Sequence, residues 1–220
     1  MAADCISALM THSIRIPLLF ALFTLPLSLT AQDTFCLRNR IRVDVDFNKI
    51  YTALQVEHRT QECCFVRPVA GYRFTPWLKG DVGYEYRWKY SNDVKQRGLL
   101  SLTGTLNSGN LSLSVRERYV MDFTRRDGST AYDAPTHILR SMIKAKCRIP
   151  ESMFSPYVST EAFTWETWNK VRMSAGTLLD VNERCSFDIY YMYCIFASRP
   201  ADPQHILGVN YRIGIFSKSK

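Results

Sequence analysis

Hydrophobic and polar residues alternate one for one along most of this chain. In the stretch LKGDVGYEYRWKY, residues 78–90, Val82 and Tyr84 fall on one parity, whereas Glu85 and Arg87 fall on the other. Successive side chains of an extended strand point to opposite faces. The period of two therefore predicts a β-strand with one apolar face and one charged face.

The same alternation recurs in eleven segments, each of roughly nine to twelve residues, which is the length of a tilted strand that crosses a bilayer. No helix is predicted between them, and NSGN at 107–110 is a tight-turn signal that joins two of them as a hairpin. The order predicts an antiparallel, up-and-down arrangement. The segments are 40–48, 51–59, 65–74, 78–90, 98–106, 111–120, 138–149, 156–165, 170–179, 185–196 and 205–216.

The connections and the aromatic residues favour a transmembrane barrel. Short connections such as 107–110 alternate with longer ones such as 124–136, and aromatic residues, among them Tyr90 and Trp165, gather near segment ends. The apolar parity would then face lipid and the charged parity a closed interior. Because bacterial single-chain barrels close with even strand numbers, we expect ten or twelve strands. A soluble, secreted β-sandwich that acts as a binding module remains an alternative, with its charged parity in water.

The N-terminus has the pattern of a secretory signal peptide. The stretch IPLLFALFTLPLSLTA, residues 16–31, is apolar, follows Arg15 and ends in small residues. We expect cleavage after Ala31, which divides the chain into a signal at 1–31 and one barrel domain at 32–220. The export signal and the barrel pattern together predict location in an outer membrane, with its lipid bilayer as the main partner.

Composition narrows the other possibilities. The 220 residues are 46% hydrophobic and 22% charged, which argues against disorder and for one domain. The net charge is +8, but the Lys and Arg residues are scattered singly along the strands, so nucleic-acid binding is not predicted. The cysteines show no CxxC or Cys/His spacing, so neither a metal site nor a cofactor is predicted.

Several stretches carry a family resemblance in their order along the chain. They include GYRFTPWLKGDVGYEY, LSLTGTL, KVRMSAGTLLDV and HILGVNYRIGIF. The sequence resembles the Gram-negative outer-membrane barrel family known as domain of unknown function 2490, over essentially all of 40–216. The resemblance implies an outer-membrane β-barrel and implies no activity.

The charged parity supplies the candidate functional residues. A surplus of cations in a narrow pore would favour small anions, whereas carboxylates paired with neighbouring arginines would fill the lumen as a structural network, and the sequence leaves both open. Arg116 and Arg118 of the RER triplet share the inward parity. The predicted lumen-facing residues are Arg42, Glu57, Arg59, Glu85, Arg87, Arg116, Arg118, Arg140, Lys144, Glu161, Arg172, Asp188 and Arg212.

We predict no enzymatic activity, with a membrane-embedded lipid hydrolase as the alternative. Hydrolysis needs a nucleophile beside a base, and the chain after the signal has no Gly-x-Ser-x-Gly element. Ser141 follows His137 by four residues without forming a clear catalytic pair, and it is not assigned to the lipid-facing parity of Leu139. We expect His137 and His205 at junctions between loops and strands.

Overall fold

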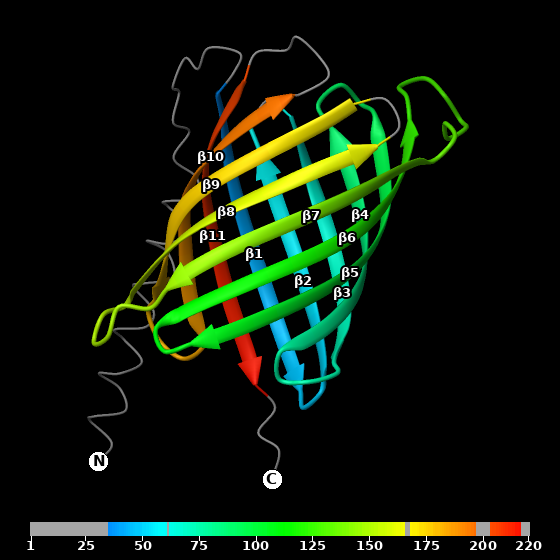
Figure 1. The fold of residues 1–220 in the computed structure, drawn as a ribbon. Coiled ribbons are helices and arrows are strands. Elements are labelled where there is room, and N and C mark those ends of the chain that lie inside the picture. Colours follow the sequence, from blue (N-terminus) through cyan, green and yellow to red (C-terminus); the bar gives the residue numbers. More distant parts are fainter. Residues whose placement is uncertain (1–34, 61, 166–167, 197–202, 217–220) are drawn as a thin grey trace, which may run out of the picture. The chain divides into compact units, whose positions relative to one another are not determined.

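The structure is a computed structural model that describes residues 35–60, 62–165, 168–196 and 203–216. Within these residues eleven β-strands close into one barrel, and each corresponds to one predicted segment (Figure 1). No helix in the described ranges is long and apolar enough to span a bilayer. The strands are β1 (Phe35–Phe47), β2 (Ile50–Arg59), β3 (Cys63–Arg73), β4 (Leu78–Lys89), β5 (Val94–Ser108), β6 (Leu111–Arg125), β7 (Thr136–Cys147), β8 (Phe154–Trp165), β9 (Trp168–Asp180), β10 (Cys185–Phe196) and β11 (Gln204–Phe216).

Every strand pairs antiparallel with its neighbour in sequence, but β1 and β11 close the barrel in parallel. The closing register runs from Phe35 beside His205 to Asp46 beside Phe216. The expectation of ten or twelve strands is therefore wrong for the described residues. A meander of eleven strands brings its first and last members together pointing the same way, so they can only pair in parallel. The even count is a tendency of bacterial barrels, not a requirement of hydrogen bonding.

The connections at the two barrel ends differ. At the end where β11 stops, two-residue turns join β1 to β2 and β5 to β6 (Figure 1). Asn48 and Gly109 in these turns have positive φ values of 53° and 54°, which Asn and Gly tolerate best. The connection at 126–135, which joins β6 to β7, lies at the opposite end.

Some strands extend beyond their predicted ends. β1 starts at Phe35, β5 starts at Val94 and β6 ends at Arg125, where Val94 and Arg125 pair. Polar residues occupy much of these extensions, so the hydrophobic alternation fades there although backbone pairing continues. The extensions bring additional charged side chains into the barrel wall.

The two faces of the wall have opposite chemistry. Large apolar side chains such as Leu100 and Ile143 are exposed on the outside, whereas charged side chains such as Glu57, Glu85 and Asp122 are buried inside. This arrangement confirms a transmembrane β-barrel and excludes the two-layer sandwich, in which the apolar parity would be buried between sheets.

Three histidine–tyrosine pairs lie on the outer face of the barrel. In each pair a ring nitrogen lies within hydrogen-bonding distance of a tyrosine hydroxyl on another strand or at its end. His137 and His205 are the second residues of β7 and β11, as expected for residues at loop–strand junctions. The pairs are His58 with Tyr90 at 2.6 Å, His137 with Tyr119 at 2.5 Å and His205 with Tyr191 at 2.5 Å.

Candidate functional site: a charged cavity inside the barrel

The inward faces of the strands surround a cavity of about 550 Å³. In the described part of the chain, eleven arginines, three lysines and four carboxylates contribute to its wall. Ten of the thirteen predicted lumen residues lie on this wall. They are Arg42, Arg59, Arg87, Arg116, Arg118, Arg140, Lys144, Glu161, Arg172 and Asp188.

The other three predicted residues lie elsewhere. Glu57 and Glu85 are fully buried behind the arginines of the wall. Arg212 on β11 is 59% exposed and donates from Nε to Asp44 Oδ2 at 2.7 Å, away from the cavity wall. The structure thus brings twelve of the thirteen residues into or directly behind one cavity wall.

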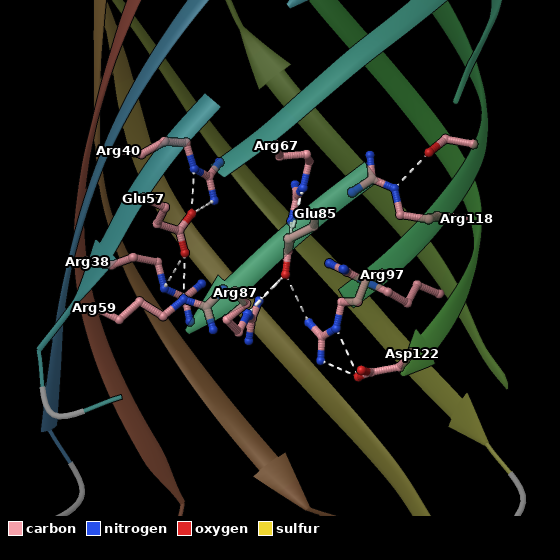
Figure 2. A network of polar contacts seen from close by, with 12 residues as sticks. Arg38, Arg40, Glu57, Arg59, Arg67, Glu85, Arg87, Arg97, Arg118 and Asp122 are labelled. Atoms are coloured by element: carbon pink, nitrogen blue, oxygen red, sulfur yellow. Dashed lines mark hydrogen bonds and ion pairs between the residues drawn. The ribbon is translucent and has the colours of Figure 1, made fainter. Parts of the chain in front are cut away.

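Glu57 on β2 holds three arginines. Arg40 lies opposite it on β1 and donates from Nη2 at 2.5 Å and from Nε at 2.7 Å. Arg59 donates from Nε at 2.5 Å, and Arg38 Nε lies 3.7 Å away (Figure 2). We call these four residues the Glu57 cluster.

Glu85 on β4 is the centre of a second group, the Glu85 cluster. Arg67 on β3, Arg87 on β4 and Arg97 on β5 all form ion pairs with it, Arg87 Nη2 at 2.6 Å and Arg97 Nη1 at 3.4 Å (Figure 2). Arg97 also donates from Nη2 to Asp122 at 2.6 Å, which extends the network to β6. One buried carboxylate thus ties three strands together.

Glu161 on β8 forms a third group, the Glu161 cluster. Arg116 on β6 and Arg140 on β7 each donate from Nη2 to its Oε1 at 2.8 Å. Arg172 on β9 lies 3.8 Å from its Oε2. The three clusters repeat one stoichiometry, in which a single carboxylate meets three guanidinium groups.

Each of the three clusters carries more positive than negative charge. A buried carboxylate is tolerated only when charged donors replace its lost hydration, and arginine is suited to this because its planar guanidinium carries five donors. Three arginines offer each glutamate more hydrogen-bond donors than its carboxylate can accept. Because guanidinium stays protonated, each cluster also retains a formal charge of about +2 at neutral pH. The cavity wall is therefore strongly cationic even though its carboxylates are paired.

Two aromatic rings hold the guanidinium groups in place, and sequence analysis missed both. Arg59, Arg67 and Arg87 lie 5.5, 4.9 and 5.1 Å from the ring centre of Phe65, which is fully buried. Arg140 and Arg172 lie 4.5 and 4.3 Å from the ring of Phe163.

Parity gives the signal that would have located these rings. Phe65 and Phe163 share the inward parity of Arg67 and Glu161 in their strands, so alternation alone places them inside. Stacking of guanidinium on a ring face adds attraction and orients the donors without adding negative charge.

The wall also contains nitrogen donors without partners. Arg118 donates from Nε to Ser101 Oγ at 2.7 Å, and no carboxylate pairs with it in the described part of the chain. The Nε atoms of Arg116, Arg140 and Arg172 are buried and have no hydrogen-bond partner among the described residues. Of these groups, Arg118 is the wall cation that no described carboxylate neutralises, so it can attract an anion in the cavity.

Further wall residues escaped prediction because they lie in the strand extensions or were not singled out. Arg38, Arg97 and Asp122 belong to the first kind, since they lie beyond the predicted ends of β1, β5 and β6. Arg67 and Lys170 lie within predicted segments but were not singled out, although their inward parity would have identified them.

Glu62, in the connection between β2 and β3, contributes one more carboxylate to the wall. Its Oε1 accepts from Arg59 at 2.9 Å and lies 3.7 Å from Arg87. Burial raises the pKa of this carboxyl, but the charges of Arg59, Arg87 and Arg38 outweigh burial and lower the pKa to about 2. Glu62 is thus ionised at neutral pH and partly neutralises the arginines at this end of the cavity.

Comparison with solved structures finds porins, of which the NanC porin, with a TM-score above 0.5, agrees with the barrel architecture. A NanC porin structure is 13% identical, with a TM-score of 0.52 and coverage of 81% of this chain and 94% of that chain. A KdgM porin is 15% identical, with a TM-score of 0.49 and coverage of 79% and 87%. An anion-selective porin from Comamonas acidovorans is 9% identical, with a TM-score of 0.39 and coverage of 74% and 52%.

The closed barrel, with exposed apolar side chains outside and charged side chains inside, defines the protein as a transmembrane β-barrel. A family model described as "Protein of unknown function (DUF2490)" matches residues 27–205, and the chain belongs to this family. The resemblance stated from the sequence is thereby confirmed. No curated protein sequence matches the chain.

Proposed function

We propose that this protein is an outer-membrane barrel that acts as a narrow pore favouring small anions. The observation that carries the proposal is the cavity wall, to which fourteen basic and four acidic side chains contribute. The proposal includes delivery by a cleaved signal at 1–31, a segment that lies outside the described residues.

Electrostatics supports the selectivity. A cavity with one dominant sign of charge and low-dielectric walls concentrates ions of the opposite sign. Arg118 lines the cavity and has no carboxylate partner in the described part of the chain, so its guanidinium is available to attract a permeating anion. The volume of about 550 Å³ suits small solutes rather than large ones.

A filled, purely structural barrel is the second candidate. It is favoured by the Glu85 cluster, in which Arg67, Arg87 and Arg97 reach one carboxylate from three adjacent strands and occupy interior space. Side chains fill the interior of many small barrels.

Neither candidate is enzymatic, and the geometry around Ser141 supports this part of the proposal. Ser141 Oγ donates to Glu117 Oε2 at 2.6 Å, whereas His137 Nδ1 is bonded to the hydroxyl of Tyr119. A lipid hydrolase would need the serine beside the base.

Conductance across planar bilayers tests the proposal. We expect small unitary currents and, in a salt gradient, a reversal potential whose sign shows anion preference. Arg118→Gln should reduce that preference, whereas Arg126→Gln, a change in an exposed connection, should leave it unaltered. Preference for cations would refute the pore proposal, and a folded barrel without conductance would favour the filled barrel.

A further inference from the structure

Three neighbouring cations of the cavity wall have no oxygen atom within hydrogen-bonding distance in the described part of the chain. They are Arg38 on β1 and Lys170 and Arg172 on β9. Arg38 Nη1 donates to the sulfur of Met192 at 3.9 Å, and Lys170 and Arg172 lie over aromatic rings. One ammonium and two guanidinium groups therefore carry donors that the barrel leaves without an oxygen acceptor.

The nearer arginines explain why Arg38 and Arg172 are left over. In the Glu57 cluster two other arginines donate to the carboxylate, whereas Arg38 Nε stays 3.7 Å from it (Figure 2). In the Glu161 cluster two other arginines likewise donate, and Arg172 Nη1 stays 3.8 Å away. Both distances exceed the length of an N–H···O hydrogen bond. These two guanidinium groups can therefore bind another acceptor.

Strand pairing brings the three cations together. Arg172 pairs with Cys194 on β10, and the next inward residue on that strand is Met192, which Arg38 reaches across β11. Diagonal neighbours on one face of two paired strands lie about 7–8 Å apart, within reach of long side chains. Lys170 precedes Arg172 by two residues and lines the same cavity.

The cations are largely buried, but they remain accessible from the cavity. Arg38 is 3% exposed and Lys170 is 8% exposed. The Nε atoms of Arg38 and Arg172 are buried without a partner, whereas Lys170 Nζ and the terminal nitrogens of Arg172 face the cavity. Burying a charged donor without an acceptor is costly. An occupant that supplies oxygen atoms would remove that cost.

Glu62, which lines the same cavity, does not supply those oxygen atoms. Its Oε1 accepts from Arg59 at 2.9 Å and lies 3.7 Å from Arg87. Within the described residues it forms no ion pair with Lys170 or with either arginine of the group.

The group lies toward the barrel end that carries the 126–135 connection. Both strands that supply it start at that end, and Arg38 is the fourth residue of β1 and Lys170 the third of β9. A solute that enters from this end meets the three cations in the first part of the cavity.

We propose that Arg38, Lys170 and Arg172 form a binding site for a phosphate group, carried by inorganic phosphate or by a small phosphate monoester. The inference deepens the proposed function and rests on the anion preference of the same cavity. Guanidinium groups pair with phosphate oxygens through two parallel hydrogen bonds, and an ammonium binds them as a point charge. A phosphate group carries a charge of about −1.5 to −2 at pH 7 and three strong acceptor oxygens. It therefore matches three cations better than chloride or a carboxylate, each of which brings one negative charge.

Isothermal titration calorimetry of the refolded full chain in octyl glucoside tests the proposal, with ionic strength held constant by sodium chloride. We expect inorganic phosphate to saturate one site per barrel. Lys170→Met and Arg172→Gln should each weaken this binding by about tenfold, because each removes one charged donor. Glycerol 3-phosphate, titrated in the same way, distinguishes the two carriers. Tighter binding of the ester assigns the site to esterified solutes, and tighter binding of inorganic phosphate assigns it to the free ion.

Lys79→Met is the matched control. Lys79 lies on the inward parity of β4 and, like Lys170, over an aromatic ring, 5.6 Å from the centre of the Tyr51 ring, but it does not line the cavity. The substitution should leave the dissociation constant for phosphate unchanged, and heat-modifiable gel migration should verify that every variant is folded. Equal weakening by Lys79→Met and Lys170→Met would overturn the proposal.

Conductance, measured separately, distinguishes this site from the pore. Anion-selective currents without saturable binding of either phosphate compound would overturn the site and leave the pore. Saturable phosphate binding by a folded barrel that does not conduct would support the site and refute the pore.

Discussion

The inner and outer faces of the same strands treat a carboxylate in opposite ways. Inside, Glu57, Glu85 and Glu161 each meet three arginines. Outside, Glu117 has one serine hydroxyl and is surrounded by exposed apolar side chains. Residues one position apart on a strand thus experience two different solvents.

This difference shows that the number of charges matters less than the donors available to them. The interior accommodates many ions because carboxylates and guanidinium groups satisfy each other and stack on Phe65 or Phe163. The outer face accommodates no charged side chain that lacks a hydrogen-bond partner, because lipid tails cannot form hydrogen bonds.

The largest effect should come from removing an interior carboxylate. Glu85→Leu leaves Arg67, Arg87 and Arg97 buried close together without their shared counter-charge, and breaking such a site costs about 3–5 kcal/mol. Urea unfolding in phosphatidylcholine vesicles measures the loss. Glu117→Leu is the matched change on the outer face and should not destabilise the monomer. Equal destabilisation by the two substitutions would abolish the distinction between the faces.

The next effect concerns a charge introduced on either face of β7. Ile143→Lys places an ammonium group among lipid-facing side chains and should cost about 2–4 kcal/mol at mid-depth. Met142→Lys places the same group on the cavity wall, where Met142 pairs with Glu161 in the ladder, and should cost less. The same unfolding assay compares them, and a greater loss for Met142→Lys would mean that the faces are assigned the wrong way round.

A smaller effect is expected at the aromatic rings of the interior. Phe65→Leu keeps an apolar side chain but removes the ring face on which Arg59, Arg67 and Arg87 stack, with an expected loss of about 1–2 kcal/mol. Tyr84→Leu on the outer face of β4, where no guanidinium stacks on the ring in the described structure, is the control and should cost less. No difference between them would show that stacking adds little.

The smallest effect should come from Glu62, and it depends on pH. Its pKa falls from 4.5 to about 2 on folding, so its ionised form stabilises the fold fully above about pH 4.5, and this contribution disappears as pH falls to about 2. The difference in unfolding free energy between the wild type and Glu62→Gln should therefore be constant from neutral pH to about 4.5 and shrink below it. A difference that grows on acidification would contradict this assignment.

Much of the fold could be predicted because successive side chains of a strand face the lipid and the barrel interior in turn. Alternation located all eleven strands and indicated which parity faces the interior. The parallel pairing of β1 with β11 follows from an odd number of meander strands, and it was not predicted because an even number of strands was expected. The ends of β5 and β6 were missed because pairing persists where apolar alternation stops.

The site was predictable in composition but not in geometry. Parity placed Arg116, Arg140 and Glu161 inside, but which carboxylate binds which arginines depends on strand register, which alternation does not specify. The outward position of Glu117 was available from its parity between Arg116 and Arg118.

Quenching of tryptophan by brominated lipid tests the central claim, the opposite orientation of the two parities, most directly. Single tryptophans would be placed at Leu100, Ser101, Leu102 and Thr103 of β5, in a variant whose native tryptophans are replaced by phenylalanine. Strong quenching at positions 100 and 102 and weak quenching at 101 and 103 is the predicted result. Equal quenching at all four positions, or stronger quenching at 101 and 103, would contradict it.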